Sequence, residues 1–388
     1  MTRLPRHLAG LLLCTLACTP DADDHGDEGH THEQGEKAWY FGADTEANRW
    51  SVTVIDTAHP DDPDTLAIDE LAALSGPDGN DAGPSWGDAI ASSDGSRIFI
   101  NATTIDKVAV FEVATGSLEA VLDVGARPVH IYNPNHGNEI WTHADGEGAF
   151  YVIDQTTLAV SGPVAAALNG TGHGKLVYAE ALGSKYFATN TNDPGAFVLD
   201  GEQKSAGTYI PLCGAPCEDD PESTCGGTHD KAYNPGMGWA LFQCSGVSGG
   251  NYAFVDAATD EVVHDLVPIG GGIASTPGGE YILVIDDDLV QIWDTGAATH
   301  DGLAFDSTLT LAGHPSDRGT EFRQVEGRWE AWIPQNEGSK VVVVNLSDYT
   351  TEEIDIGTLT RRRAPDTSPG AARSGLIISS IPATRACS

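Results

Sequence analysis

The sequence predicts an all-β fold, a seven-bladed β-propeller of four-stranded blades, and three observations indicate it. Seven short apolar runs end in an acidic or amide residue and recur about every 48 residues, which is typical of propeller blades. Short strand patterns separated by turn signals such as Asp94-Gly95 fill the intervals. No long helical pattern interrupts them. The seven runs cover residues 52–56, 108–112, 150–154, 196–200, 252–256, 290–294 and 341–345.

Four strands can be assigned within a single repeat. In the third repeat they are expected at residues 128–132, 139–143, 150–154 and 159–163. The first repeat begins with residues 39–42 and 52–56, which resemble second and third strands, so its innermost strand is missing. The apolar segment 375–381 can supply that strand. A propeller closed in this way by both chain ends leaves no open sheet edge.

The first 17 residues are expected to be an export signal. Arg3 and Arg6 precede an apolar stretch over residues 8–17 that is too short to span a bilayer as a mature helix. Leu16-Ala17-Cys18 resembles a lipobox, so Cys18 is the expected site of lipidation, with an ordinary secretory signal as the alternative. We therefore expect an exported protein of the periplasm or cell envelope, anchored to the outer membrane by lipid.

Residues 18–37 are predicted to form a disordered acidic tether, because they lack the apolar residues needed to build a core. The tether contains His25, His30 and His32 among many carboxylates. Such a segment can capture a divalent cation weakly, whereas the alternative is a solvated linker without a ligand. The propeller is then expected over residues 38–382, followed by a tail over residues 383–388.

Four cysteines cluster within one repeat, at Cys213, Cys217, Cys225 and Cys244. Clustered cysteines persist as disulfides in an oxidising compartment, which agrees with export. A zinc ribbon is the alternative, but the spacing lacks its paired C-x2-C knuckles. Two disulfides are therefore favoured, and a bond between Cys225 and Cys244 would brace the segment that carries His229.

The chain carries 57 acidic and 20 basic residues, a formal net charge of -37. This charge argues against nucleic acid and against anionic membrane surfaces as partners, and it favours cations. The alternative explanation is solubility in a salty habitat, with most carboxylates solvated in loops.

Three histidines, His130, His173 and His229, stand near the start of the innermost strand in three consecutive repeats. Innermost strands line the central channel of a propeller, so these imidazoles are expected to share one channel mouth, where three of them can hold zinc or a similar ion. Asp88 and His314 occupy comparable positions in the second and seventh repeats. The alternative role is hydrogen bonding in turns. The remaining histidines of the body are interpreted as surface residues: His59, His136, His143, His264 and His300.

Signatures of catalysis are scarce. The chain contains no G-x-S-x-G elbow, no H-E-x-x-H pair, no P-loop and no strand-to-helix G-x-G-x-x-G. Neighbouring carboxylates say little about acid–base catalysis in a chain this acidic. We therefore expect a protein that is not an enzyme.

Several segments resemble the periplasmic β-propeller zinc chaperones of the AztD type. They are the His-rich acidic segment 24–32, Gly172-His173-Gly174, residues 225–229 with residues 242–244, and residues 311–314. The resemblance implies zinc binding and transfer to the solute-binding protein of a zinc importer. The chain departs from the family in having Asp230 after His229 and in the additional pair Cys213 and Cys217, and the family does not imply a lipid anchor.

The sequence thus favours an exported, monomeric metallochaperone that binds zinc, with copper as the alternative ion because imidazole sites bind it more tightly. Two other functions fit the same chain. One is a cell-surface scaffold that resembles the broad group of YVTN-like propellers and binds no metal. The other is a metal-dependent hydrolase or lactonase, because three protein ligands leave one position open for water.

Overall fold

Short antiparallel strands make up most of the computed structural model. It describes residues 37–44, 49–56, 60, 64–68, 86–134, 136–164, 171–178, 180–212, 225–245, 251–268, 270–295, 307–315, 320–335, 340–355 and 375–379. All of them belong to one unit, residues 34–388. The expected signal, tether and tail, with Cys18, His25, His30 and His32, lie outside the described residues. Among the described residues there is no helix that is long and apolar enough to cross a membrane.

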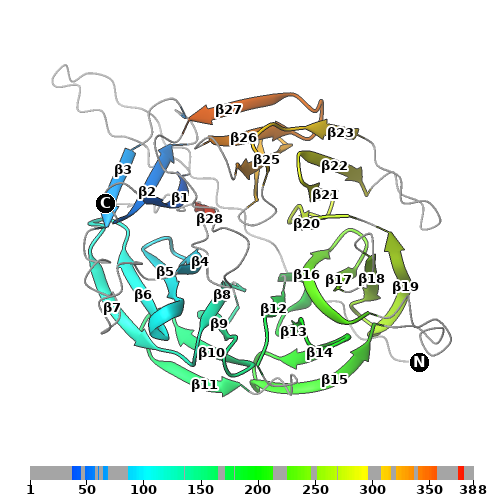
Figure 1. Ribbon diagram of the computed structural model, residues 1–388, viewed down its shortest axis with the longest axis horizontal. Coiled ribbons are helices and arrows are strands. Elements are labelled where there is room, and N and C mark those ends of the chain that lie inside the picture. Colours follow the sequence, from blue (N-terminus) through cyan, green and yellow to red (C-terminus); the bar gives the residue numbers. More distant parts are fainter. Residues whose placement is uncertain are drawn as a thin grey trace, which may run out of the picture. The chain divides into compact units, whose positions relative to one another are not determined.

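Six sheets each contain four strands that follow one another in the chain (Figure 1). The first three of these blades are β4 (Trp86–Ala91), β5 (Arg97–Ala102), β6 (Lys107–Glu112), β7 (Leu118–Asp123); β8 (Pro128–Tyr132), β9 (Glu139–Ala144), β10 (Ala149–Asp154), β11 (Val160–Val164); and β12 (Gly174–Val177), β13 (Lys185–Asn190), β14 (Gly195–Asp200), β15 (Ser205–Pro211). Two short 3-10 helices, η2 (Thr103–Ile105) and η3 (Glu180–Leu182), stand between strands.

The other three blades of consecutive strands complete this series. They are β16 (Gly227–Asn234), β17 (Trp239–Ser245), β18 (Asn251–Asp256), β19 (Glu261–Pro268); β20 (Gly272–Ser275), β21 (Tyr281–Asp286), β22 (Leu289–Asp294), β23 (Ser307–Thr310); and β24 (Glu321–Val325), β25 (Arg328–Pro334), β26 (Lys340–Asn345), β27 (Thr351–Asp355).

The blade count requires a correction. Counted as blades of four consecutive strands, the propeller has six, not the seven expected from the apolar runs. The run at residues 52–56 belongs to a composite four-stranded sheet in the order β28-β1-β2-β3, in which a strand from the C-terminal part of the chain completes the first repeat, as the sequence predicted. Its strands are β1 (Lys37–Asp44), β2 (Arg49–Asp56), β3 (Asp64–Ile68) and β28 (Gly375–Ser379). Counting one apolar run per repeat does not distinguish a contiguous blade from an assembled one.

At the end of several apolar runs the acidic or amide residue caps the following turn, as Asp154, Asp200, Asp256 and Asn345 do. Asp154 Oδ1 accepts hydrogen bonds from the backbone N–H groups of Thr156 (3.0 Å) and Thr157 (2.7 Å). Asp256 Oδ1 accepts the equivalent pair, each at 2.9 Å. These backbone hydrogen bonds lower the pKa of both carboxyl groups. The recurring residue is thus a structural signature of the turn between the third and fourth strands.

Aromatic side chains join neighbouring blades. The rings of Trp141 and Tyr186 meet edge to face with centroids 5.3 Å apart, and those of Phe187 and Phe242 do so at 5.9 Å. All four are buried. Burying such rings is the main favourable term that holds blade against blade. The tryptophans that the structure describes as buried pack in clusters shared by neighbouring sheets.

The innermost strands contact one another in the order β28, β4, β8, β12, β16 and β20, and β24 contacts β28 (Figure 1). Because strands within each blade are antiparallel, the connection into the innermost strand and the turn between the second and third strands lie on the same face. We call this side of the propeller the histidine face, because it carries the histidines described below.

The closing contact is the antiparallel pairing of β28 with β1, in which Ile377 lies opposite Trp39. Removing residues 375–388 should leave β1 with an unpaired edge, which lowers the unfolding temperature by about 10 °C or more and promotes aggregation. Removing only residues 380–388 is the control and should change the unfolding temperature little. Thermal unfolding followed by circular dichroism measures both, and equal unfolding temperatures would contradict the role of β28.

Candidate metal site

His130 lies within β8 and is buried, with 3% of its surface exposed. Its Nδ1–H donates to Asp88 Oδ2 of the preceding blade at 2.5 Å. Burial lowers the pKa of His130 well below its ordinary value, although the neighbouring Asp88 carboxylate opposes this effect. The imidazole is therefore neutral at physiological pH, and its Nε2 carries the lone pair.

His173 immediately precedes β12, and its Nδ1–H donates to Asp145 Oδ2 at 2.7 Å. Asp145 lies in the turn between β9 and β10, and its backbone oxygen also accepts the N–H of Gly172 at 2.9 Å. The flanking glycines are required by close approaches, because a Cβ on Gly172 would lie 2.2 Å from Asn190 Oδ1 and one on Gly174 would lie 2.3 Å from His143 Nε2. The Gly-His-Gly segment thus threads between two blades.

The two Nε2 atoms of His130 and His173 face each other at 2.7 Å, with ring centroids 4.3 Å apart. The ring of His229, in β16, stacks beside that of His173 at a centroid distance of 5.5 Å and an interplanar angle of 25°. Three imidazoles from three consecutive blades therefore gather on the histidine face. This is the juxtaposition expected from the sequence.

Irregular strand pairing coincides with these residues. The register shifts between Trp86 and Ala89 around Asp88, between Pro128 and His130, and between Thr228 and Lys231 around His229. The innermost strands β20 and β24 keep a regular register along their described pairings. Bulges re-aim side chains next to functional sites, so their presence on these strands favours a functional role for the cluster.

A disulfide between Cys225 and Cys244 fixes the start of the strand that carries His229. Both cysteines are buried, and Cys244 lies opposite Thr228 in the β16–β17 pairing. Thr228 Oγ1 in turn donates to the backbone oxygen of Asn190 in the preceding blade at 3.2 Å. The other two cysteines of the cluster, Cys213 and Cys217, lie outside the described residues.

Two of the three histidines offer donors that suit a zinc ion. The Nδ1 atoms of His130 and His173 are each engaged by a carboxylate, which fixes the tautomer and leaves Nε2 to bind metal, the arrangement found behind zinc-binding histidines. Two imidazole nitrogens on one tetrahedral zinc stand about 3.3 Å apart, from Zn–N bonds of about 2.0 Å. His130 and His173 would need to separate by only about 0.6 Å. His229 adds a third imidazole stacked on His173, but the three histidines do not offer one donor atom each that all lie within 4.8 Å of one another in this structure, so a three-nitrogen site would require the His229 side chain to move closer.

His314 does not join this cluster. Its Nδ1 lies 2.8 Å from Asp287 Oδ1 and 3.3 Å from Asp288 Oδ1, in the turn between β21 and β22. The three residues form a separate group of potential cation ligands on the histidine face. Asp287 is exposed and Asp288 is half-buried, and acidic groups near the surface are common without an ion.

The interpretation of His143 as a surface residue is wrong. His143 is completely buried, because it lies directly opposite His130 in the β8–β9 pairing and therefore projects from the same face of the sheet. Its Nδ1–H donates to Asp145 Oδ1 at 2.8 Å. His136 is half-buried, and nothing is described of the side chains of His59, His264 and His300. Sequence reasoning also missed Asp145, whose only signal was its place in a turn after a buried strand.

Burial would raise the pKa of Asp145, but the hydrogen bonds from His143 and His173 outweigh it and hold that pKa well below its ordinary value. The carboxylate is therefore ionised at neutral pH and accepts from both imidazoles. Sequence spacing could not reveal this bridge, because its two donors come from different blades.

Further polar residues of the innermost strands accompany the cluster. Tyr132 and Tyr178 meet edge to face at 5.9 Å, and Lys231 Nζ lies 5.5 Å from the centre of the Tyr132 ring. Burial raises the pKa of Glu321 in β24 to about 7, although the Lys231 ammonium opposes this effect. These groups connect β8, β12, β16 and β24 through the middle of the propeller.

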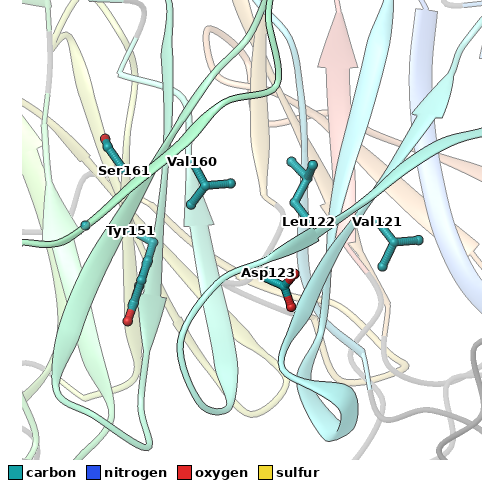
Figure 2. A pocket seen from close by; sticks show the side chains of 7 residues that line it. Val121, Leu122, Asp123, Tyr151, Val160 and Ser161 are labelled. Atoms are coloured by element: carbon teal, nitrogen blue, oxygen red, sulfur yellow. The ribbon is translucent and has the colours of Figure 1, made fainter.

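A separate open pocket of about 480 Å³ lies away from the histidines, between the outermost strands β7 and β11. Figure 2 shows Val121 and Asp123 on one side of it and Tyr151, Val160 and Ser161 on the other. Its lining combines aliphatic side chains with a single carboxylate and holds no group of metal ligands.

No family model matches the sequence, and no curated protein matches it. Solved structures with a similar fold include apo AztD from Citrobacter koseri (13% identity, TM-score 0.54, covering 89% of this chain and 98% of that one). They also include the β-propeller domain of Cps50 (Swd1) from Myceliophteria thermophila (13%, 0.52, 70% and 86%) and hydrazine synthase from Kuenenia stuttgartiensis (15%, 0.50, 68% and 77%). At these identities the likeness shows the propeller fold alone.

The raised pKa of Glu321 predicts a pH-dependent stability. Between the ordinary glutamate pKa of 4.5 and about 7, the folded state holds a proton that the unfolded chain has lost, so stability falls as the pH rises through this window. Glu321→Gln should remove this slope and stabilise the protein at pH 8 by roughly 2 kcal/mol. Denaturant unfolding at pH 5 and pH 8 measures it, with the exposed Glu326→Gln as control. A parallel pH dependence in wild type and Glu321→Gln would refute the prediction.

Proposed function

We propose that this chain is an exported metallochaperone that binds one zinc ion through His130, His173 and His229. The observation that supports it best is the 2.7 Å approach of two Nε2 atoms whose Nδ1–H groups are both held by carboxylates. Such second-shell carboxylates orient the imidazole and raise its basicity toward a metal. With both Nδ1 atoms protonated, two neutral imidazoles present only lone pairs to each other at this distance, so a metal ion or an additional proton is needed between the two Nε2 atoms.

The position of the site suits transfer rather than permanent storage. His173 retains 18% of its side-chain surface and Asp88 retains 32%, so the cluster is reachable from the histidine face. Three nitrogen donors leave one coordination position to which a ligand of a receiving protein can bind. The surplus of carboxylates attracts cations toward the propeller.

The partner that we propose is the solute-binding protein of a zinc importer, because segments of the sequence resemble the AztD-type chaperones and apo AztD shares the fold. In this proposal His25, His30 and His32 collect zinc, and Cys18 carries a lipid that anchors the chain at the outer membrane. Zinc is cargo here, and the chain performs no chemistry on it.

Zinc titration of the purified, untagged protein against a chromophoric chelator tests the proposal. We expect one tight equivalent, and we expect His130→Ala, His173→Ala and His229→Ala each to weaken it by more than about 100-fold, because loss of an outer partner alone costs 10–100-fold. His314→Ala is the matched control and should keep the tight equivalent, since its imidazole contacts Asp287 and Asp288 instead.

Two outcomes favour the other functions. Absence of tight zinc in the wild-type protein would leave an exported scaffold propeller. Turnover of esters or lactones that is abolished by chelators would indicate a metal-dependent hydrolase, in which the open coordination position holds water.

A further inference from the structure

His143 is a buried histidine that reaches none of the atoms expected to bind the ion. Its side chain is fully buried, and its ring packs edge to face on Phe150 at a centroid distance of 4.8 Å. Its Nε2 makes no hydrogen bond and faces the backbone of Gly174. Leaving a buried imidazole nitrogen unsatisfied costs free energy, so an apolar side chain would suit this position better unless the other nitrogen has a function.

The other ring nitrogen of His143, Nδ1, donates to Asp145, the carboxylate that also holds His173. Asp145 is 6% exposed and uses both carboxylate oxygens: Oδ1 accepts from His143 at 2.8 Å, and Oδ2 accepts from His173 at 2.7 Å. If the first hydrogen bond were absent, the carboxylate could turn about its side-chain bonds, and the second bond would lose its fixed direction. His143 thus determines the plane in which Asp145 meets His173.

His143 also limits the backbone that carries His173. A Cβ on Gly174 would lie 2.3, 2.5 and 2.7 Å from the Nε2, Cε1 and Cδ2 atoms of the His143 ring. The residue after His173 is therefore seated against the ring itself. One side chain in this way fixes both the partner of the His173 imidazole and the main chain from which that imidazole projects.

We infer that His143 is the positioning residue of this zinc site: it holds Asp145 and the start of β12 so that His173 Nε2 points at the ion, and it does not bind the ion itself. The inference rests on the proposed function. It adds a residue from outside the three-histidine cluster. It also explains why His143, Asp145 and Gly174 occupy their positions.

The test compares donors placed at different points of the side chain. His143→Leu removes the donor and keeps an apolar side chain, His143→Asn places an N–H near the former Nδ1, and His143→Gln places it farther out. We expect His143→Leu and His143→Gln to weaken zinc binding by about 10–100-fold with one equivalent still bound. His143→Asn should retain most of the affinity. Phe150→Leu is the control, because it loosens the packing of the same ring without removing a donor.

The same variants are measured without zinc by recording the imidazole N–H resonances of histidine-labelled protein. The His173 N–H should be protected in wild type and in His143→Asn, and it should broaden by exchange with water in His143→Gln and His143→Leu. If His143→Leu fails to fold, the comparison of Asn with Gln decides the matter.

Three results would overturn the inference: wild-type affinity in His143→Leu, equal losses in the Asn and Gln variants, or loss of the bound equivalent, which would make His143 a ligand. A wild-type protein that binds no zinc would instead overturn the proposed function. In that case the N–H resonances still decide whether His143 positions His173.

Discussion

Both oxygens of the Asp145 carboxylate accept a hydrogen bond from a histidine, and the geometry of the candidate site depends on this bridge. Burying a carboxylate is unfavourable, yet the two charge-assisted hydrogen bonds outweigh that cost and keep the group ionised. An ionised Asp145 fixes which nitrogen of His173 carries the proton. The Nε2 atom of His173 then faces the Nε2 atom of His130, whose own Nδ1 is held by Asp88 in the same way. Two carboxylates from neighbouring blades thus set the tautomers of two imidazoles that face each other.

The propeller supplies the rigidity that such a site requires. Its blades are joined by buried aromatic pairs, and its outer turns are capped by the acidic residues that end the third strands. Against this regular background, the innermost strands that carry Asp88, His130 and His229 are bulged. Regular packing therefore sets the distance between blades, and local irregularity sets the direction of the side chains. The disulfide adds a covalent constraint beside His229.

Much of the architecture was predictable, because strand alternation and turn residues act locally. The repeat, the four-stranded blades, the closing strand and the meeting of His130, His173 and His229 follow from that local pattern. The blade count was wrong, because the repeat at residues 52–56 was counted as a seventh blade although its four strands are not consecutive in the chain. His143 was misplaced, since the face to which a histidine points depends on pairing register. The repeat spacing of the sequence likewise could not predict that His314 lies apart from the other histidines.

The composite sheet has a consequence for the order in which the protein assembles. Asp88, His130, Asp145, His173 and His229 all belong to four blades of consecutive strands, whereas closure of the propeller requires β28, near the end of the chain. A chain that emerges from its N-terminus therefore completes the donors of the site well before it can close the ring.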